Sequence, residues 1–337
     1  MFRVLTTSLL LTLVLGVGGG GPHAAADVSG GRDDGGRFGI RLLEAPVNRA
    51  NDPRARYEIV DHLKPGSTIR RRVQVTNTSA KPLHVGMGAT AATIERHRFT
   101  AGAGSARNEL TSWISFDRPA FDVPARGHAV VTTTIRVPDT ASEGERYAVV
   151  WAQTDAPPSG TRNIGVAARV GIRVYLDVGV GGEPASDFQV EKLVPARAGD
   201  GRPEVLAQVS NTGGRVLEMG GKLTLSDGPG GLRAGPFPVT LGTALAPGDR
   251  APVRVVLDER LPNGPWDVRL ELSSGMIRRT VTATLTFPTA AGTTGRPVGP
   301  RSAALGVAAT AVAVPVLAAA GFLLFRRRRR AREMGRA

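Results

Sequence analysis

The side chains that could carry out acid–base, nucleophilic or metal chemistry are few and widely spaced. The five histidines are His23, His62, His84, His97 and His128, and the chain contains no cysteine. None of the histidines stands in H-E-x-x-H or another paired-ligand spacing, and no thiolate is available to complete a zinc site. We therefore expect no metal, no cofactor and no catalytic histidine.

Other catalytic signatures are also missing from the sequence. No G-x-S-x-G motif occurs, residues 102–105 (GAGS) lack the strand–turn–helix context, and 228–231 (GPGG) carries no G-K-[ST] for phosphates. Glu58 and Asp61 could form a carboxylate pair, but we expect both on the solvated surface. A hydrolase with a site built from distant loops is the alternative left open, because one sequence does not reveal spatial proximity.

Three kinds of residue could bind a ligand without reacting. Trp113, Trp151 and Trp266 could stack on sugars; we expect Trp151 and Trp266 in the core, whereas Trp113 fits core and surface equally well. The triplet 70–72 (RRR) could touch an acidic polymer, although a solvated strand edge is the preferred interpretation. The tripeptide 77–79 (NTS) matches a glycosylation acceptor, and we interpret it as a turn.

The elements that position these residues are predicted to be strands. In 266–272 (WDVRLEL) apolar and polar residues alternate without exception, and 129–137 has a similar apolar face. A period of two is typical of half-buried strands, with one face in the core and one in water. Turn signals such as 64–66 (KPG) and 247–249 (PGD) separate the runs. Short strands at this spacing predict antiparallel sandwiches.

The two halves of this region resemble each other, which predicts two tandem immunoglobulin-like sandwiches. The paired landmarks, in chain order, are 73–79 (VQVTNTS) with 207–213 (AQVSNTG), 124–127 (PARG) with 247–249 (PGD), and 144–147 (GERY) with 264–266 (GPW). Each landmark is common in sandwiches. Their shared order favours a duplicated unit.

The two ends of the chain predict export and a membrane anchor. Residues 1–26 combine a basic start, an apolar run and small residues, the order of a cleavable signal peptide. Residues 303–325 carry no charge and are followed by five arginines, which indicates a transmembrane helix with a cytoplasmic basic tail. Part of the net charge of +14 lies in that tail, so it gives no reason to expect a nucleic-acid partner.

The expected localisation is the cell membrane, with a single pass and an extracellular N-terminal region. The expected organisation is a signal peptide (1–26), a disordered lead-in (27–37), an immunoglobulin-like domain (38–178), a linker (179–186), a second immunoglobulin-like domain (187–288), a flexible stalk (289–302), a transmembrane helix (303–325) and a basic tail (326–337).

Residues 57–60 (YEIV), 64–66, 72–79 and 144–150 (GERYAVV) carry a family resemblance. With them, the first domain resembles the peptidoglycan-binding domain of the WxL-interacting protein family of Gram-positive surface proteins. The resemblance implies an immunoglobulin-like fold and non-catalytic attachment to the cell wall. No binding residue can be carried over from that family.

The leading functional expectation is a non-enzymatic surface scaffold. Its first domain would hold peptidoglycan or another anionic envelope polymer, and its second domain a surface protein. The wall or protein hydrolase is one alternative. The other is a chaperone-like assembly factor for exported proteins, suggested by a chaperone-like pattern of strands. The scaffold itself needs no pocket, because sheet faces and edge strands can recruit an extended partner strand.

Overall fold

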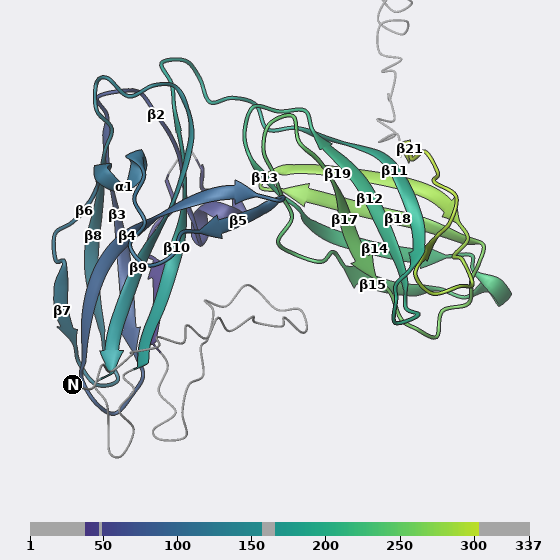
Figure 1. Cartoon of the computed structure of the whole chain (residues 1–337), viewed down its shortest axis with the longest axis horizontal. Coiled ribbons are helices and arrows are strands. Elements are labelled where there is room, and N and C mark those ends of the chain that lie inside the picture. Colours follow the sequence, from purple (N-terminus) through teal and green to yellow (C-terminus); the bar gives the residue numbers. More distant parts are fainter. Residues whose placement is uncertain (1–37, 47–48, 157–165, 303–337) are drawn as a thin grey trace, which may run out of the picture. The chain divides into compact units, whose positions relative to one another are not determined.

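The structure is a computed structural model that describes residues 38–46, 49–156 and 166–302. Among these residues strands dominate, and the helices are α1 (Glu109–Trp113) and two 3-10 turns, η2 (Pro53–Arg56) and η3 (Pro229–Gly231) (Figure 1). The all-β expectation is confirmed.

Residues 38–178 form two sheets, which together we call the N-terminal sandwich. Sheet A has the strand order β1-β3-β8-β6, and sheet B the order β2-β10-β9-β4-β5, with β7 also paired to β4. The strands are β1 (Phe38–Leu42), β2 (Ile59–Leu63), β3 (Thr68–Asn77), β4 (Leu83–Glu95), β5 (Arg98–Ala101), β6 (Ile114–Phe116), β7 (Ala120–Val123), β8 (His128–Arg136), β9 (Gly144–Ala156) and β10 (Val166–Val178). Pairing is antiparallel except between β2 and β10, which run parallel.

Residues 188–302 form the C-terminal sandwich. Sheet C has the order β17-β12-β11-β20, sheet D the order β15-β14-β18-β19-β21, and β13 pairs with β16. The strands are β11 (Phe188–Arg197), β12 (Pro203–Asn211), β13 (Leu217–Glu218), β14 (Gly220–Ser226), β15 (Ala234–Pro238), β16 (Ala244–Leu245), β17 (Arg250–Val256), β18 (Trp266–Ser274), β19 (Ile277–Leu285), β20 (Thr293–Thr294) and β21 (Arg301–Ser302).

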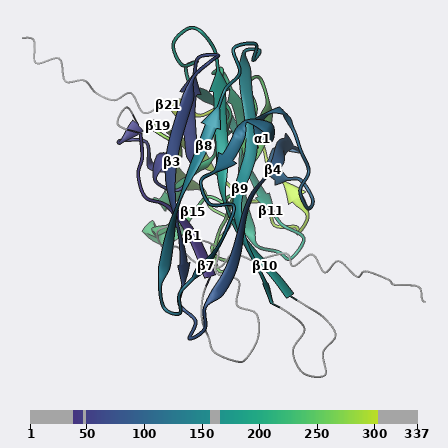
Figure 2. The same ribbon diagram turned by 90° about the vertical axis from the view of Figure 1, so that its left-hand side faces the viewer.

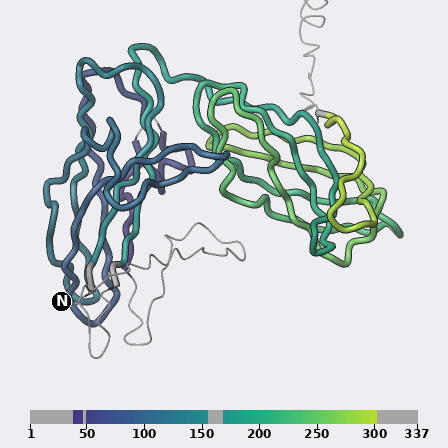
Figure 3. The backbone as a smooth tube through the Cα atoms, in the orientation of Figure 1, coloured from purple at the N-terminus to yellow at the C-terminus, as the bar shows by residue number. Residues whose placement is uncertain are grey.

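Each sandwich has its own hydrophobic core. Val73 of sheet A and Val150 of sheet B belong to one cluster, and Phe188 of sheet C and Trp266 of sheet D belong to another. The residues of each core come from one continuous stretch of the chain. In Figure 3 the strands of the first stretch run from purple to teal, and those of the second from green to yellow. Independent folding of the two stretches, as the expected domain division implies, stays a prediction.

The alternation predicted for 266–272 is confirmed, because β18 buries Trp266, Val268, Leu270 and Leu272. The prediction for β9 is wrong. Its buried face is the small-residue face with Ala148, Val150 and Ala152, whereas Trp151 is half-buried on the outer face. Trp151 lies there over Gly88 of β4, where an added Cβ would come within 2.2 Å of the indole.

Two expectations about the C-terminal part are corrected. Residues 289–302, expected as a flexible stalk, pair with the C-terminal sandwich: β20 pairs with β11, and Val298 with Leu193. The described residues also contain no helix long and apolar enough to cross a membrane. Residues 303–325, on which the expected membrane localisation rests, lie outside them, as do the predicted signal peptide and lead-in; that localisation is not retained.

Candidate functional site

His62 is held on both sides of its ring. It lies on β2, next to the parallel strand β10, so its Nδ1 is 2.6 Å from Asp177 Oδ2. Its Nε2 is 3.0 Å from the carbonyl oxygen of Gly181. A catalytic histidine needs one nitrogen facing a nucleophile or substrate. Here a backbone carbonyl occupies that position, which makes the His62–Asp177 pair structural.

The remaining described histidines stand on separate segments. His84 is exposed and lies 2.8 Å from Asp122, His97 sits in the β4–β5 turn with a φ of 59°, and His128 is exposed at the start of β8. No group of three His, Asp or Glu residues within the described ranges is arranged to hold a metal ion. These three side chains therefore carry no candidate metal site.

The predicted carboxylate pair is neither solvated nor a pair. Asp61 is 5% exposed and accepts a 2.7 Å hydrogen bond from Arg71. Glu58 contacts a different guanidinium, that of Arg173, at 3.8 Å. Burial, with the nearby carboxylate of Glu218, raises the pKa of Glu58 to about 8. The two carboxyl groups therefore contact different guanidinium groups and do not form a pair with each other.

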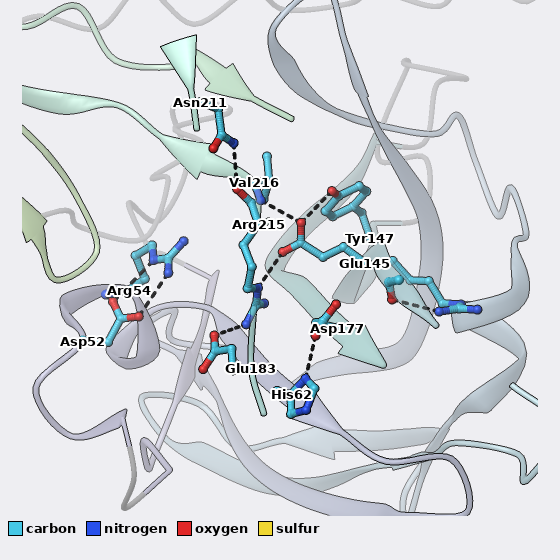
Figure 4. Close-up of polar contacts among 12 residues, drawn as sticks. Asp52, Arg54, His62, Glu145, Tyr147, Asp177, Glu183, Asn211, Arg215 and Val216 are labelled. Carbon is cyan, nitrogen blue, oxygen red and sulfur yellow. Dashed lines mark hydrogen bonds and ion pairs between the residues drawn. The ribbon is translucent and has the colours of Figure 1, made fainter. Parts of the chain in front are cut away.

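Arg215 and Glu145 form the centre of a buried polar cluster (Figure 4). Arg215 Nε lies 3.1 Å from Glu145 Oε1, and their side chains are 3% and 7% exposed. The second oxygen of Glu145 accepts from the N–H of Val216 at 2.8 Å and from the hydroxyl of Tyr147 at 2.9 Å. Arg215 also pairs with Glu183. A buried ion pair stabilises only when its remaining hydrogen-bonding capacity is met in this way.

A second group of charges surrounds Glu218 of β13. Its carboxylate accepts from Arg173 at 2.5 Å and from the hydroxyl of Tyr175, both on β10. Burial and the nearby carboxylates raise the pKa of Tyr175 and of Tyr147, so both phenols stay protonated donors. Val60, Tyr175, Val216 and Ala244 form a small apolar cluster of their own.

These clusters contain matched charges but no nucleophile beside a base. Their members join β2, β9 and β10 to the segments around 183 and 215–218. Sequence reasoning missed them because the partners are 32 to 71 residues apart in the chain. The arrangement holds segments together, and we find in it no chemistry to perform on a substrate.

The three tryptophans that could have stacked on sugars are buried or covered by another side chain. Trp113 and Trp266 are buried, with exposed fractions of 8% and 0%. The guanidinium of Arg169 covers the Trp151 ring at 4.0 Å from its centroid. Asn77 is fully buried and its side-chain amide donates to backbone carbonyls, which confirms the turn interpretation of 77–79.

The most distinctive surface feature is the outer edge of β10 (Figure 1). On one edge, β10 pairs with β9 along its whole length. On the other, β2 pairs only from Val174 to Val178. Residues 166–173 thus have no hydrogen-bonded strand on that edge in the described part of the chain. β1 lies close by, but it pairs only with β3 of sheet A.

Comparison with known proteins gives fold-level similarities only. Neither a family model nor a curated protein matches the chain. Similar solved structures include the CupB2 chaperone of Pseudomonas aeruginosa (TM-score 0.37, 14% identity, covering 68% of this chain and 97% of that one). The E. coli chaperone DraB gives a TM-score of 0.37 at 14% identity, covering 74% and 99%. The chaperone–tip adhesin complex of CFA/I fimbriae gives 0.35 at 12%, covering 74% and 99%.

These findings correct the family resemblance. The three structures named above are chaperones or a complex of one, and no family model supports the WxL-interacting assignment, which is therefore wrong. The peptidoglycan-binding role and the Gram-positive surface setting rested on that assignment and are not retained. Similarity at these TM-scores transfers no partner or activity to the chain.

Proposed function

We propose that this chain is a non-catalytic protein-binding module that takes up an extended segment of a partner protein as an added strand. The binding place is the outer edge of β10 at 166–173. This function corresponds to the chaperone-like alternative expected from the sequence, with a defined binding surface. The observation that carries it is the missing neighbour on an edge that already accepts β2 further along.

The backbone of an edge strand is suited to this role. Unpaired N–H and C=O groups at a sheet edge form a template for another extended chain, and main-chain hydrogen bonds supply affinity. Natural edges are often blocked by proline or a bulge. Residues 166–173 (VAARVGIR) contain no proline, and their register with β9 runs without a shift.

The side chains along this edge fit a strand with one apolar face. Val170 is half-buried and packs against the core, as does Phe38 of the adjacent β1. Ile172 of the same face is buried. A strand added beside β10 would alternate in the same way, so its inward residues would meet this apolar border. We expect a partner segment with apolar residues at every second position.

The test is a selection of short displayed random peptides on the full chain, followed by affinity measurements on two matched variants. Val170→Lys places a charge where the added strand would cover it. Val130→Lys makes the same change on the outer face of β8, where Val130 is 38% exposed. We expect Val170→Lys to weaken binding by about tenfold or more, because burying an uncompensated charge costs at least about 1.4 kcal/mol.

The selected peptides should bind the Val130→Lys variant like the unmodified chain. A Val170→Thr variant should also keep binding, because it adds no charge at the edge. If all three variants bind equally well, the peptides sit elsewhere and the proposed edge is wrong. Melting curves of each variant show whether a loss reflects unfolding.

A further inference from the structure

The arginine triplet at 70–72 does not act as one patch. Arg71 points inward and donates to Asp61 at 2.7 Å. Arg72 points outward and pairs with Glu44 at 2.7 Å. Arg70 is exposed, and within the described residues its side chain has no ion-pair partner. The triplet also lies on β3, which is an interior strand of sheet A, so the expected strand edge is wrong.

Two further arginines extend the outward pair into a row across three strands. β3 and β8 lie side by side in Figure 2, and their register places Thr68 opposite Arg136. The register of β1 places Arg41 opposite Gln74. On the outer face of sheet A, Arg70 and Arg72 are therefore neighbours along β3. Arg41 lies diagonally next to Arg72, and Arg136 lies diagonally next to Arg70. Neighbours of this kind are separated by about 7–8 Å diagonally and about 6.8 Å along a strand.

The surroundings of this arginine row leave it with a positive charge. Arg41 donates to the neutral Gln74 at 2.7 Å, and Arg136 is exposed with no ion pair among the described residues. Three carboxylates are close: Glu44 pairs with Arg72, Asp117 accepts the backbone N–H of Thr132 at 2.8 Å, and Asp139 lines the groove beside Arg136. Four guanidinium groups thus outnumber three carboxylates, and within the described residues only Glu44 forms an ion pair with the row.

One end of the row opens into a shallow groove lined by hydroxyl groups. Its volume is about 670 Å³. It is lined by Thr68, Ser115, Thr134 and Arg136, together with the carboxylate-bearing Asp139. Hydroxyl and guanidinium donors suit the oxygen atoms of a carboxylate.

We propose that the arginine row binds an extended acidic segment of a partner protein, with Asp or Glu at every second position. An extended chain repeats same-side residues every 6.6–6.8 Å or so, which matches the steps of the row. The groove beside Arg136 receives one of these carboxylates. The row lies on the outer face of sheet A, and the open edge of β10 belongs to sheet B, so this site does not depend on the proposed function.

The experiment measures binding of two synthetic peptides to the full chain at low salt. One peptide alternates Glu with Thr, and the other has the same composition with its Glu residues in one block. The test variant is the double change Arg70→Gln with Arg136→Gln. Its control, Arg233→Gln with Arg278→Gln, removes the same charge from exposed positions of the C-terminal sandwich.

We expect the alternating peptide to bind the unmodified chain more tightly than the block peptide does. The test variant should bind the alternating peptide about tenfold more weakly than the unmodified chain, which corresponds to about 1.4 kcal/mol. The control should change its affinity less than about twofold, and Val170→Lys should leave it unchanged. Equal affinities for the two peptides would overturn the proposal. So would equal losses in the two double variants, or tighter binding of single-stranded DNA or a sulfated polysaccharide through the same arginines.

Discussion

Asn77 and Asn211 occupy equivalent turns of the two sandwiches and make the same hydrogen bonds. In each, Oδ1 accepts from the N–H two residues further on, at 2.9 Å. In each, Nδ2 donates to the carbonyl oxygen four residues further on, at 2.8 and 2.7 Å. Nδ2 also donates across the sandwich, to Val123 and Pro124 in one case and to Leu245 in the other. The similarity between 73–79 and 207–213 therefore extends to the contacts.

Replacing either asparagine by alanine should destabilise the sandwich that contains it. Asn211→Ala leaves several buried backbone groups without their partner, and each costs about 1–3 kcal/mol. We expect a loss of about 2–4 kcal/mol in the free energy of unfolding, measured by urea denaturation. Thr212→Ala, at the exposed neighbouring position, should change it by less than about 0.5 kcal/mol. Similar losses at both positions would contradict the assignment.

The alternation in β18 gives a second prediction. Leu270 is fully buried, so Leu270→Asp places an unpaired charge in the core and should cost several kcal/mol or unfold the C-terminal sandwich. Arg269 lies on the opposite face and pairs with exposed Glu271 at 3.0 Å. Arg269→Ala should change the free energy of unfolding by less than about 0.5 kcal/mol. Comparable effects in thermal melts would show that the faces are reversed.

The two sandwiches could be predicted from the sequence where one face is apolar and the other polar. In 266–272 the two faces differ sharply, so the pattern assigns them correctly. In β9 both faces are apolar, and the bulky Tyr147 and Trp151 suggested the wrong one. What decided the outcome is Gly88 on the adjacent strand, which leaves room for the indole. A packing relation between two strands is not visible in the periodicity of either.

The polar cluster and the open edge depend on longer-range geometry still. Arg215 meets Glu145 across 70 residues of sequence, and no local pattern marks either residue as buried. The edge at 166–173 is defined by how far β2 extends along β10. The sequence predicts that a strand is present. Where two strands stop pairing depends on how the whole sheet assembles.

Removing one member of the buried ion pair should be far more damaging than removing an exposed pair. Arg215→Met leaves Glu145 without its guanidinium, whereas Glu183 keeps that of Arg49. Loss of one partner of a buried pair costs about 3–5 kcal/mol. Arg202→Met breaks the exposed pair with Asp200 and should leave the free energy of unfolding nearly unchanged, because solvent screens that pair. Denaturation of both variants at neutral pH checks this. A cost for Arg215→Met no larger than that for Arg202→Met would be incompatible with the buried network.

The raised pKa of Glu58 should make the folded chain less stable as pH rises. Its pKa is about 8 in the folded chain against a reference of 4.5, so folding favours its protonated form. That contribution is complete below about pH 4.5 and is lost as pH rises through 8. Burial is the main cause that opposes ionisation of Glu58, the carboxylate of Glu218 adds to it, and the guanidinium groups of Arg173 and Arg54 act in the opposite direction.

Glu58→Gln should therefore stabilise the chain at pH 9 relative to pH 5, by roughly 2–4 kcal/mol after allowance for screening. Glu44→Gln is a control of opposite sign, because Arg72 lowers the pKa of Glu44 and its contribution is lost as pH falls. Denaturant midpoints between pH 4 and 9 give both profiles. A Glu58→Gln effect that is flat with pH would show that Glu58 is ionised throughout.

Strand addition at β10 is tested most directly by hydrogen exchange of the backbone amides in 166–173, in the free chain and with a selected peptide bound. In the free chain, those amides that point away from β9 should exchange fast, because no described strand pairs with that edge. With saturating peptide they should slow by about tenfold or more, which corresponds to about 1.4 kcal/mol of added protection. Unchanged exchange in this stretch while the peptide is bound would contradict strand addition at this edge.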